Sequence, residues 1–345
     1  MSMKSPAKAA AEQADALRIE EADPKKLARH IKKLLSKQPM NEGELAEASN
    51  VPIALVRTIV ADLRGIGVNV RSLAHGKMFI SSIIDPGGAL TLQAEPRADG
   101  WTVFGIITDN HKGNRHHRQD VEDAAYKTFE REGVKTVLNA GNALDGEARF
   151  NKNELIAHGI DGQIDLWTET TPQVKNLTTH FITGRDHEGW WNERECINVG
   201  EYMQMKAEKA GRKDLHYLGH VEADVSLKCG NASAVLRVMH PGGGSSYAMS
   251  YAPQKIVEAY QGGEKPDVLI IGHYHKFDYC VPREVHVISA GCAEDQTIFM
   301  RTKKIAAHVG FVLVKLKQDS VDGHITRLCV EWNPFFDRGY YEKRY

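Results

Sequence analysis

Five short apolar runs, each followed by side chains of the kind that bind metals, constrain this sequence more than any other feature. Runs of this length, rich in Val and Ile, are typical of buried strands. A helical stretch over about 120–132 separates the first two runs, so strands and helices alternate as in α/β domains. The runs and the polar residues after them are 103–108 with Asp109 and His111, 134–138 with Asn142 and Asp145, 178–183 with Asp186 and His187, 234–239 with His240, and 268–271 with His273 and His275.

The side chains at these strand ends indicate a metal site. Open α/β sheets build their sites where strands end, and two residues spaced i, i+2 can face one point if the backbone turns there. Imidazole together with carboxylate suits manganese, iron, zinc and similar divalent ions. One His-x-His pair is weak evidence, whereas five such elements in order are hard to produce by chance.

In this order the motifs resemble the calcineurin-like metallophosphoesterase family. The family pattern is Asp-x-His, Gly-Asp-x-x-Asp, Gly-Asn-His-Asp/Glu, a single His, and Gly-His-x-His, and the match spans residues 101–330. The resemblance implies an α/β fold for residues 101–332, a two-sheet sandwich flanked by helices. It also implies a centre of two divalent metal ions, with manganese favoured and iron, zinc, nickel or magnesium as alternatives.

The resemblance assigns a role to each strand-end residue. The first metal would be held by Asp109, His111 and His275, and the second by Asp186, His240 and His273. Asn142 stands at the bridging position, and Asp145 and Glu188 match the motif tails, which orient ligands. The implied reaction is hydrolysis of a phosphoester by a metal-activated hydroxide, with His187 as the acid that protonates the leaving oxygen.

Two departures from the family pattern affect this expectation. Asn142 replaces the bridging aspartate, and Asp186 replaces the usual asparagine of the third motif. We hypothesise that the two changes compensate, because one negative charge moves from the bridge to the second metal. A site with one metal, or a decayed site, is the alternative. Arg185 replaces a glycine; it either shifts the turn or offers a guanidinium to phosphate as a catalytic residue.

The N-terminal region is expected to form a separate small domain. Residues 1–24 are predicted to be a flexible tail. Within 25–82, apolar residues at helical spacing predict a first helix, Asn41 and Glu44 predict a capping box for a second, and a third helix precedes a hairpin at 68–80. This arrangement resembles a winged helix-turn-helix domain. Residues 83–100 are predicted to be a linker, and 333–345 a C-terminal tail.

The charge distribution suggests which partner this small domain binds. The whole chain has a net charge of −1, but residues 25–82 hold ten basic and four acidic residues, a balance of +6. Such a basic patch is typical of phosphate-backbone binding, although winged helices also dock on proteins. A basic loop after the first motif could grip a polyphosphate or be merely solvated. The candidate nucleic-acid contacts are Lys32, Lys33, Arg57, Arg64, Arg71, Lys77, Lys112 and Arg115.

The remaining composition narrows the class. Five scattered cysteines without a Cys-x-x-Cys pair favour a reducing, cytoplasmic setting, and no apolar run is long enough to span a membrane. Trp190 and Trp191 could stack on bases or belong to the core.

The sequence thus predicts a metal-dependent phosphodiesterase or nuclease acting on nucleic acid, DNA rather than RNA, as in phage or bacterial DNA metabolism. A cyclic-nucleotide or small-molecule phosphoesterase and a non-catalytic DNA-binding or scaffold protein are the alternatives. A protein partner or a second copy could bind through the winged helix or the C-terminal tail.

Overall fold

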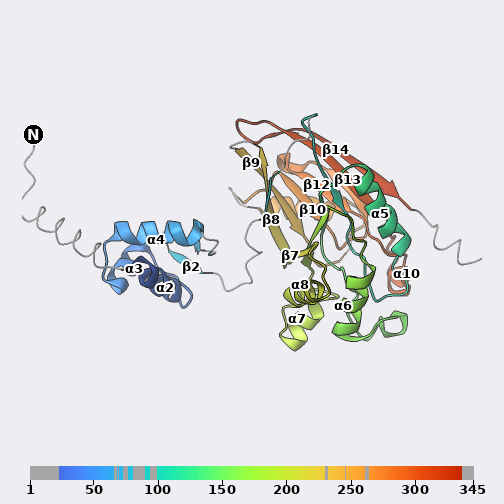
Figure 1. The fold of residues 1–345 in the computed structure, drawn as a ribbon, viewed down its shortest axis with the longest axis horizontal. Coiled ribbons are helices and arrows are strands. Elements are labelled where there is room, and N and C mark those ends of the chain that lie inside the picture. Colours follow the sequence, from blue (N-terminus) through green and yellow to red (C-terminus); the bar gives the residue numbers. More distant parts are fainter. Residues whose placement is uncertain are drawn as a thin grey trace, which may run out of the picture. The chain divides into compact units, whose positions relative to one another are not determined.

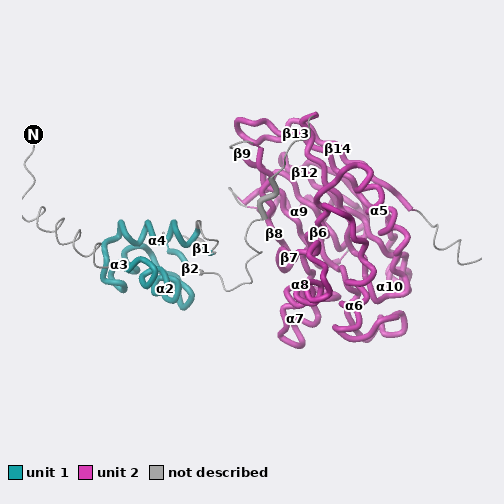
Figure 2. The backbone as a smooth tube through the Cα atoms, in the orientation of Figure 1, with its two compact units in different colours: residues 1–85 teal, residues 86–345 magenta. Residues whose placement is uncertain are grey.

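The structure, a computed structural model, divides the chain into two compact units, residues 1–85 and 86–345 (Figure 2). It describes residues 23–65, 68, 70–72, 77–80, 90–93, 99–229, 232–244, 246–260 and 264–335. Each unit is described by itself. The tail predicted at the N-terminus, the hairpin turn at 74–76 and the last ten residues fall almost wholly outside these ranges. The domain limits given above stay predictions, with the corrections that follow.

The described residues of the first unit form three helices and a small two-stranded sheet. The helices are α2 (Pro24–Leu35), α3 (Glu42–Ser49) and α4 (Ile53–Gly65), and β1 (Val70–Ser72) pairs antiparallel with β2 (Met78–Ile80). Asp23 caps α2, and the predicted Asn41–Glu44 capping box begins α3. Apolar residues of all three helices, among them Ile31, Leu45 and Val56, bury one face each in a common core. Assignment of this unit to the winged-helix class stays a prediction.

Two six-stranded sheets form the framework of the second unit (Figure 1). The first has the order β14 (Ile325–Pro334), β13 (Gly310–Gln318), β4 (Thr102–Ile106), β5 (Thr136–Asn139), β6 (Thr178–Thr183) and β7 (Leu215–His220). The second has the order β11 (Phe277–Cys280), β12 (His286–Ala290), β10 (Val268–Ile271), β9 (Ala232–Met239), β8 (Glu222–Cys229) and β3 (Leu90–Gln93). Strands β4 to β7 are parallel to one another, as are β9, β10 and β12.

The main core lies between the two sheets, and helices cover their outer faces. Along β10, Val268 and Ile270 pack into the core that both sheets share, whereas Leu269 and Ile271 pack beside Val257 of α9 (Tyr251–Ala259). This period of two is what a strand buried on both faces requires. Helix α5 (Gln119–Arg131) covers β4 and β13. Helices α6 (Gly159–Thr170), α7 (Gly189–Glu195) and α8 (Val199–Lys209) cover β6 and β7.

The two-sheet sandwich predicted for this unit is therefore confirmed. Three short helices complete it: α10 (Ile298–Lys303) and the single turns η2 (Lys152–Glu154) and η3 (Pro282–Glu284). All five cysteines are free, as the sequence predicts. Among the helices that the structure describes, none is long and apolar enough to span a membrane.

The structure corrects both predicted boundary segments of this unit. Residues 90–93 belong to the predicted linker, but they form β3 and pair in parallel with β8, so this segment is an edge strand. The predicted C-terminal tail begins inside β14, whose Asn333 and Pro334 pair with β13, and Phe335 packs against the α5 side of the sheet. The pairing of β3 with β8 joins segments far apart in the sequence and leaves little local signal, which explains the first error. The second is an error of only a few residues in where β14 ends.

Candidate metal centre

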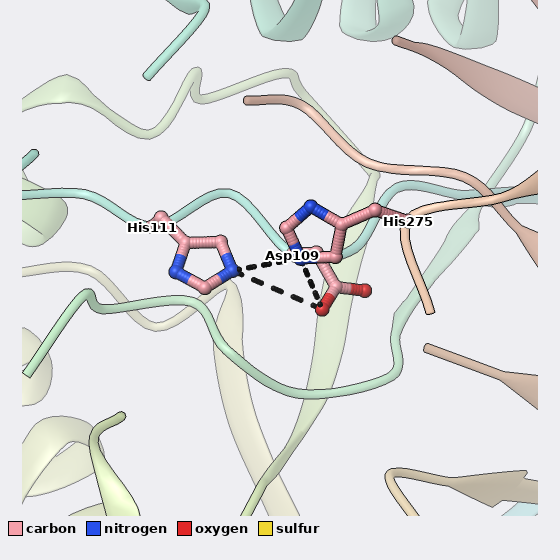
Figure 3. Close-up of side chains that lie close together, drawn as sticks. All are labelled: Asp109, His111 and His275. Atoms are coloured by element: carbon pink, nitrogen blue, oxygen red, sulfur yellow. Dashed lines mark hydrogen bonds and ion pairs between the residues drawn. The ribbon is translucent and has the colours of Figure 1, made fainter. Parts of the chain in front are cut away.

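The first group of metal-type side chains comes from the ends of β4 and β10 (Figure 3). Asp109 and His111 follow β4, and His275 follows β10. Nε2 of His275 lies 3.4 Å from Oδ1 of Asp109 and 3.1 Å from Nε2 of His111. Nε2 of His111 lies 3.9 Å from the same Asp109 oxygen. All three side chains are buried, so three ligand atoms surround one point, as a divalent ion requires.

The second group comes from the ends of β6, β9 and β10. Asp186 lies between two imidazoles: its Oδ1 is 3.2 Å from Nε2 of His240, and its Oδ2 is 3.1 Å from Nδ1 of His273. The backbone N–H of His273 donates to both oxygens of Asp109 at 3.0 Å. The two groups are therefore neighbours, because the loop after β10 supplies His275 to one and His273 to the other.

A buried oxygen without a partner shows that this site fits a cation. Oδ1 of Asn142 is buried and has no hydrogen-bond partner, whereas Asp186 Oδ1 and His240 Nε2 are buried beside each other at 3.2 Å. Such atoms are costly to bury unless something else satisfies them. A Cβ added to Gly184 would lie 2.8 Å from the Asn142 oxygen and 3.0 Å from the Asp186 oxygen. The absence of that Cβ therefore leaves room beside both oxygens.

The backbone at the site is held in a conformation that costs energy. Non-glycine residues with positive φ are uncommon and cost about 1–3 kcal/mol each, and they cluster at functional sites. Six of the strand-end residues have positive φ between 50° and 77°: Asp109, His111, Asn142, His187, His273 and His275. These left-handed turns let side chains at i and i+2 face one site. The i, i+2 spacing predicted a turn of the backbone at these strand ends, and the positive φ values are that turn.

The two groups differ in their protonation without metal. Burial and the charge of His187 outweigh the opposing Asp145 and lower the pKa of His111 to about 4. Burial opposes ionisation of Asp109, but its hydrogen bond to His275 and nearby imidazoles lower its pKa to about 2. Burial also opposes charge on His240, yet Asp186 and Asp109 raise its pKa to about 9. At neutral pH the imidazole of His111 is therefore neutral, with one N–H, whereas His240 is a positively charged imidazolium.

Asp145 joins the first group to His187. Nδ1 of His111 donates to its carboxylate at 3.0 Å, and Nδ1 of His187 donates to its backbone oxygen at 2.8 Å and lies 3.3 Å from its carboxylate. Burial disfavours the charged imidazole, but the Asp145 hydrogen bond and charge raise the pKa of His187 to about 9. The side chain of His187 remains 21% exposed. It is thus a protonated imidazole that faces an open cavity.

Glu188 supports the turns behind Asn142. Its Oε1 accepts the backbone N–H groups of Asn142 at 2.8 Å and of Gly184 at 3.0 Å. The carboxyl is buried, and burial raises its pKa to about 7. The orienting role that the resemblance gives this residue agrees with these contacts, because they fix the backbone on which the Asn142 oxygen is presented.

Two predicted site residues lie elsewhere. The Arg185 side chain is 68% exposed, pairs with Glu193 at 3.5 Å and does not line the cavity, so we withdraw its catalytic role. Lys112 is buried and pairs with Glu122 at 2.6 Å, which leaves its ammonium closed to nucleic acid. From the sequence, Lys112 was expected in a basic loop that either grips a polyphosphate or is merely solvated. The loop is buried at this residue, where Lys112 forms a short β-bridge with Leu144.

The other predicted nucleic-acid contacts are on the surface. Arg115 is exposed and donates to the Asn153 backbone oxygen. In the first unit, Lys32 and Lys33 are exposed on α2. Exposed Arg57 pairs with Glu42 at 2.7 Å, and Lys77 lies 3.7 Å from Glu44. Arg64 donates to the Val70 oxygen at 3.1 Å. The side chain of Arg71 is outside the described part of the chain.

The cavity over the metal-type residues has a volume of about 560 Å³ and includes residues that the sequence analysis missed. Glu294 is buried, with Oε2 3.9 Å from Nε2 of His111 and 3.8 Å from Nδ1 of His275. Phe150 and Phe299 line the outer wall beside Trp190. Glu294 follows β12 and could have been found by extending the strand-end rule to that strand, but nothing local singles out the two phenylalanines.

Known proteins resemble this chain only weakly. No family model matches it, and no curated protein matches it by sequence. An archaeal phosphodiesterase is 16% identical with a TM-score of 0.32, over 66% of this chain and 99% of its own. Vps29 from Entamoeba histolytica complexed with zinc is 14% identical with a TM-score of 0.31, over 67% and 98%. GAP50 of Plasmodium is 11% identical with a TM-score of 0.37, over 68% and 89%. These similarities assign no family, so the function rests on the site.

Proposed function

We propose that the chain is a metal-dependent phosphoesterase of the calcineurin-like type. The observation that carries the proposal is the pair of neighbouring ligand groups, Asp109–His111–His275 and Asp186–His240–His273. Two residues of each group, His111 and His275, and Asp186 and His273, line one cavity. The unpartnered Asn142 oxygen lines the same cavity and would complete the centre. Two divalent ions held there would supply a nucleophilic water at neutral pH and neutralise charge on a phosphate.

The chain's own residues account for the remaining steps. The cavity beside His187 would bind the phosphoester, and the imidazolium of His187 would donate its proton to the leaving oxygen. Asp145 keeps that proton available, because it raises the pKa of His187 to about 9 and accepts from Nδ1. Donation from the other ring nitrogen then leaves the supporting hydrogen bond intact.

We propose nucleic-acid phosphodiesters as the substrates. Support comes from the exposed cations of the first unit, Lys32, Lys33 and Arg57, on a three-helix unit with a small hairpin. Such cations would position a phosphate backbone without reading its sequence. The prediction of a winged helix that holds DNA is part of this proposal.

One assay series tests the proposal. The purified chain would be supplied with Mn²⁺ and offered a generic phosphodiester, a phosphomonoester, and single- and double-stranded DNA. We expect hydrolysis of the diester and DNA, and a loss of about 10²–10⁴-fold in His187→Gln. Absence of hydrolysis from every phosphoester, with metal bound, would overturn the enzymatic function. Unchanged DNA binding after removal of residues 1–85 would overturn the role of the first unit.

Asn142 favours one rival, a binding protein that no longer turns over. An amide offers two cations one good acceptor oxygen and no charge, so it bridges them less well than a carboxylate. The rival predicts that Asn142→Asp creates activity that the native chain lacks. The proposed enzyme predicts that the native chain is active without this change.

A further inference from the structure

Aromatic side chains continue outward from the metal-type residues along one wall of the cavity. The rings of His187 and Trp190 stack with centroids 4.9 Å apart. Phe150 meets Trp190 edge-on at 5.7 Å and lies 5.3 Å from Phe299. All of them line the same cavity. The wall of Phe150, Trp190 and Phe299 therefore begins at the proposed acid and ends at the surface.

The outer rings of this wall are left open to solvent. Phe150 is 53% exposed and Phe299 is 43% exposed, although the two rings lie against each other. Exposed aromatic groups that gather at one place mark a binding surface. The wall shares its cavity with His187 and residues of the ligand groups. A phosphoester bound by those residues would therefore place the group next to its phosphate against the wall, and a flat group would match the flat rings there.

Cations lie close to the wall. The Lys303 ammonium lies 6.0 Å from the centre of the Phe299 ring. A second hollow, next to Trp191, is lined by Arg149, Lys152 and Arg194 together with Glu147 and Glu195. Rings for stacking with cations alongside are how proteins hold single-stranded nucleic acid. A protein partner would need apolar surface alone and gives no reason for the continuity with His187.

We propose that Phe150, Trp190 and Phe299 form a stacking wall for the nucleobase next to the phosphate at the metal centre. The inference rests on the proposed function and names its substrate class: nucleotide units, either free or within a strand. Stacking would favour any base over no base, because every base has an aromatic face. The flanking cations would add affinity only when further phosphates follow.

Binding to the Mn²⁺-loaded full chain tests this inference. The probes are deoxyadenosine 5′-monophosphate, deoxyribose 5-phosphate, which lacks the base, and a short single-stranded oligodeoxynucleotide. We expect the mononucleotide to bind about 5- to 150-fold more tightly than the base-free sugar phosphate. In Phe150→Ala/Phe299→Ala, which keeps Trp190, this preference should fall severalfold while affinity for deoxyribose 5-phosphate and the metal content stay unchanged. The oligonucleotide should bind more tightly than the mononucleotide if the strand is the source, and equally if free nucleotide is.

The control variant is Tyr279→Ala, which removes an aromatic ring that is 39% exposed on β11, outside the cavity. It should leave every affinity unchanged. Equal affinity of the native chain for the two monophosphates would overturn the inference, as would an undiminished preference in the double variant. A change of oligomeric state in that variant, without a base preference in the native chain, would assign the wall to a protein contact instead. Failure of the proposed function would be seen separately, as absent metal or absent hydrolysis.

Discussion

The Asp145 carboxylate accepts a hydrogen bond from Nδ1 of His111 at 3.0 Å, and both side chains are buried. This contact decides which nitrogen of His111 keeps its lone pair. With Nδ1 donating, Nε2 is the acceptor, and Nε2 is the atom that faces Asp109 and His275. A carboxylate behind a histidine ligand fixes the ring and increases its basicity.

Asp145→Asn is therefore expected to weaken metal binding at the first group. Loss of such a supporting carboxylate typically lowers metal affinity about 10- to 100-fold, and calorimetric titration with Mn²⁺ measures it. Asp224→Asn is the matched control, because Asp224 is ion-paired with Arg237 in the second sheet, away from the cavity. Equal Mn²⁺ affinity in the two variants would contradict the orienting role of Asp145.

The pKa values predict that pH acts on the two groups differently. The pKa of His240 is raised to about 9, so metal must displace its proton at pH 7. Apparent affinity at the second group should rise about tenfold between pH 7 and pH 8. Asp109 and His111, with pKa values of about 2 and 4, are already deprotonated, so the first group should change little. Two binding constants with the same pH dependence would contradict this assignment.

The same shift has a consequence for the metal-free chain. A histidine whose pKa is raised on folding stabilises the fold below its unfolded value of about 6.5, and this stability is lost as pH rises through about 9. His240→Gln should therefore lower the free energy of unfolding more at pH 6 than at pH 9.5. Chemical denaturation of the metal-free protein at the two pH values measures the difference.

How far the sequence predicts this fold depends on how local each signal is. The limits of β6 and β10 match their apolar runs, and the Asn41–Glu44 cap is present, because these features depend on adjacent residues. Edge strand β3 was taken for a linker, since its pairing with β8 joins segments more than a hundred residues apart. Lys112 was taken for a surface cation, because its partner Glu122 lies on α5.

The residues of the candidate site divide in the same way, into those with a local sequence signal and those without one. His273 and His275 could be placed by their strand-end motif, because parallel strands bring their ends together. The phenylalanines of the stacking wall could not, since Phe150 lies in a turn and Phe299 in the distant helix α10, and neither belongs to a motif. The catalytic role predicted for Arg185 was wrong, because a residue next to a motif residue in the chain does not have to point its side chain into the same site.

The exchange of Asn142 and Asp186 can be tested as a pair. The Oδ1 atoms of both residues would contact an added Gly184 Cβ, so they face one space and should couple. Asp186→Asn should weaken metal binding, because it removes the only negative charge of the Asn142–Asp186 pair. Adding Asn142→Asp to that variant should restore metal binding. A coupling of about 0.5–3 kcal/mol is expected for groups in contact. Additive effects on metal affinity in the double variant would refute compensation.

Glu294 offers a separate test of the first group. Its carboxyl is buried, its Oε1 has no hydrogen-bond partner, and burial raises its pKa well above the usual range. Glu294→Gln keeps the shape of the neutral acid, so the metal-free melting temperature should change little. The metal-induced rise in melting temperature should shrink, because a carboxyl this close to His111 and His275 can ionise beside a bound cation, whereas an amide cannot. An unchanged rise would make Glu294 a structural residue only.

The most direct test of the account is to count the metal ions in the purified, Mn²⁺-equilibrated chain and assay the same sample for phosphodiester hydrolysis. The account predicts two ions per chain and hydrolysis that His187→Gln lowers about 10²–10⁴-fold at unchanged metal content. A chain that holds both ions but hydrolyses no phosphoester, or one that binds no divalent metal, would contradict it.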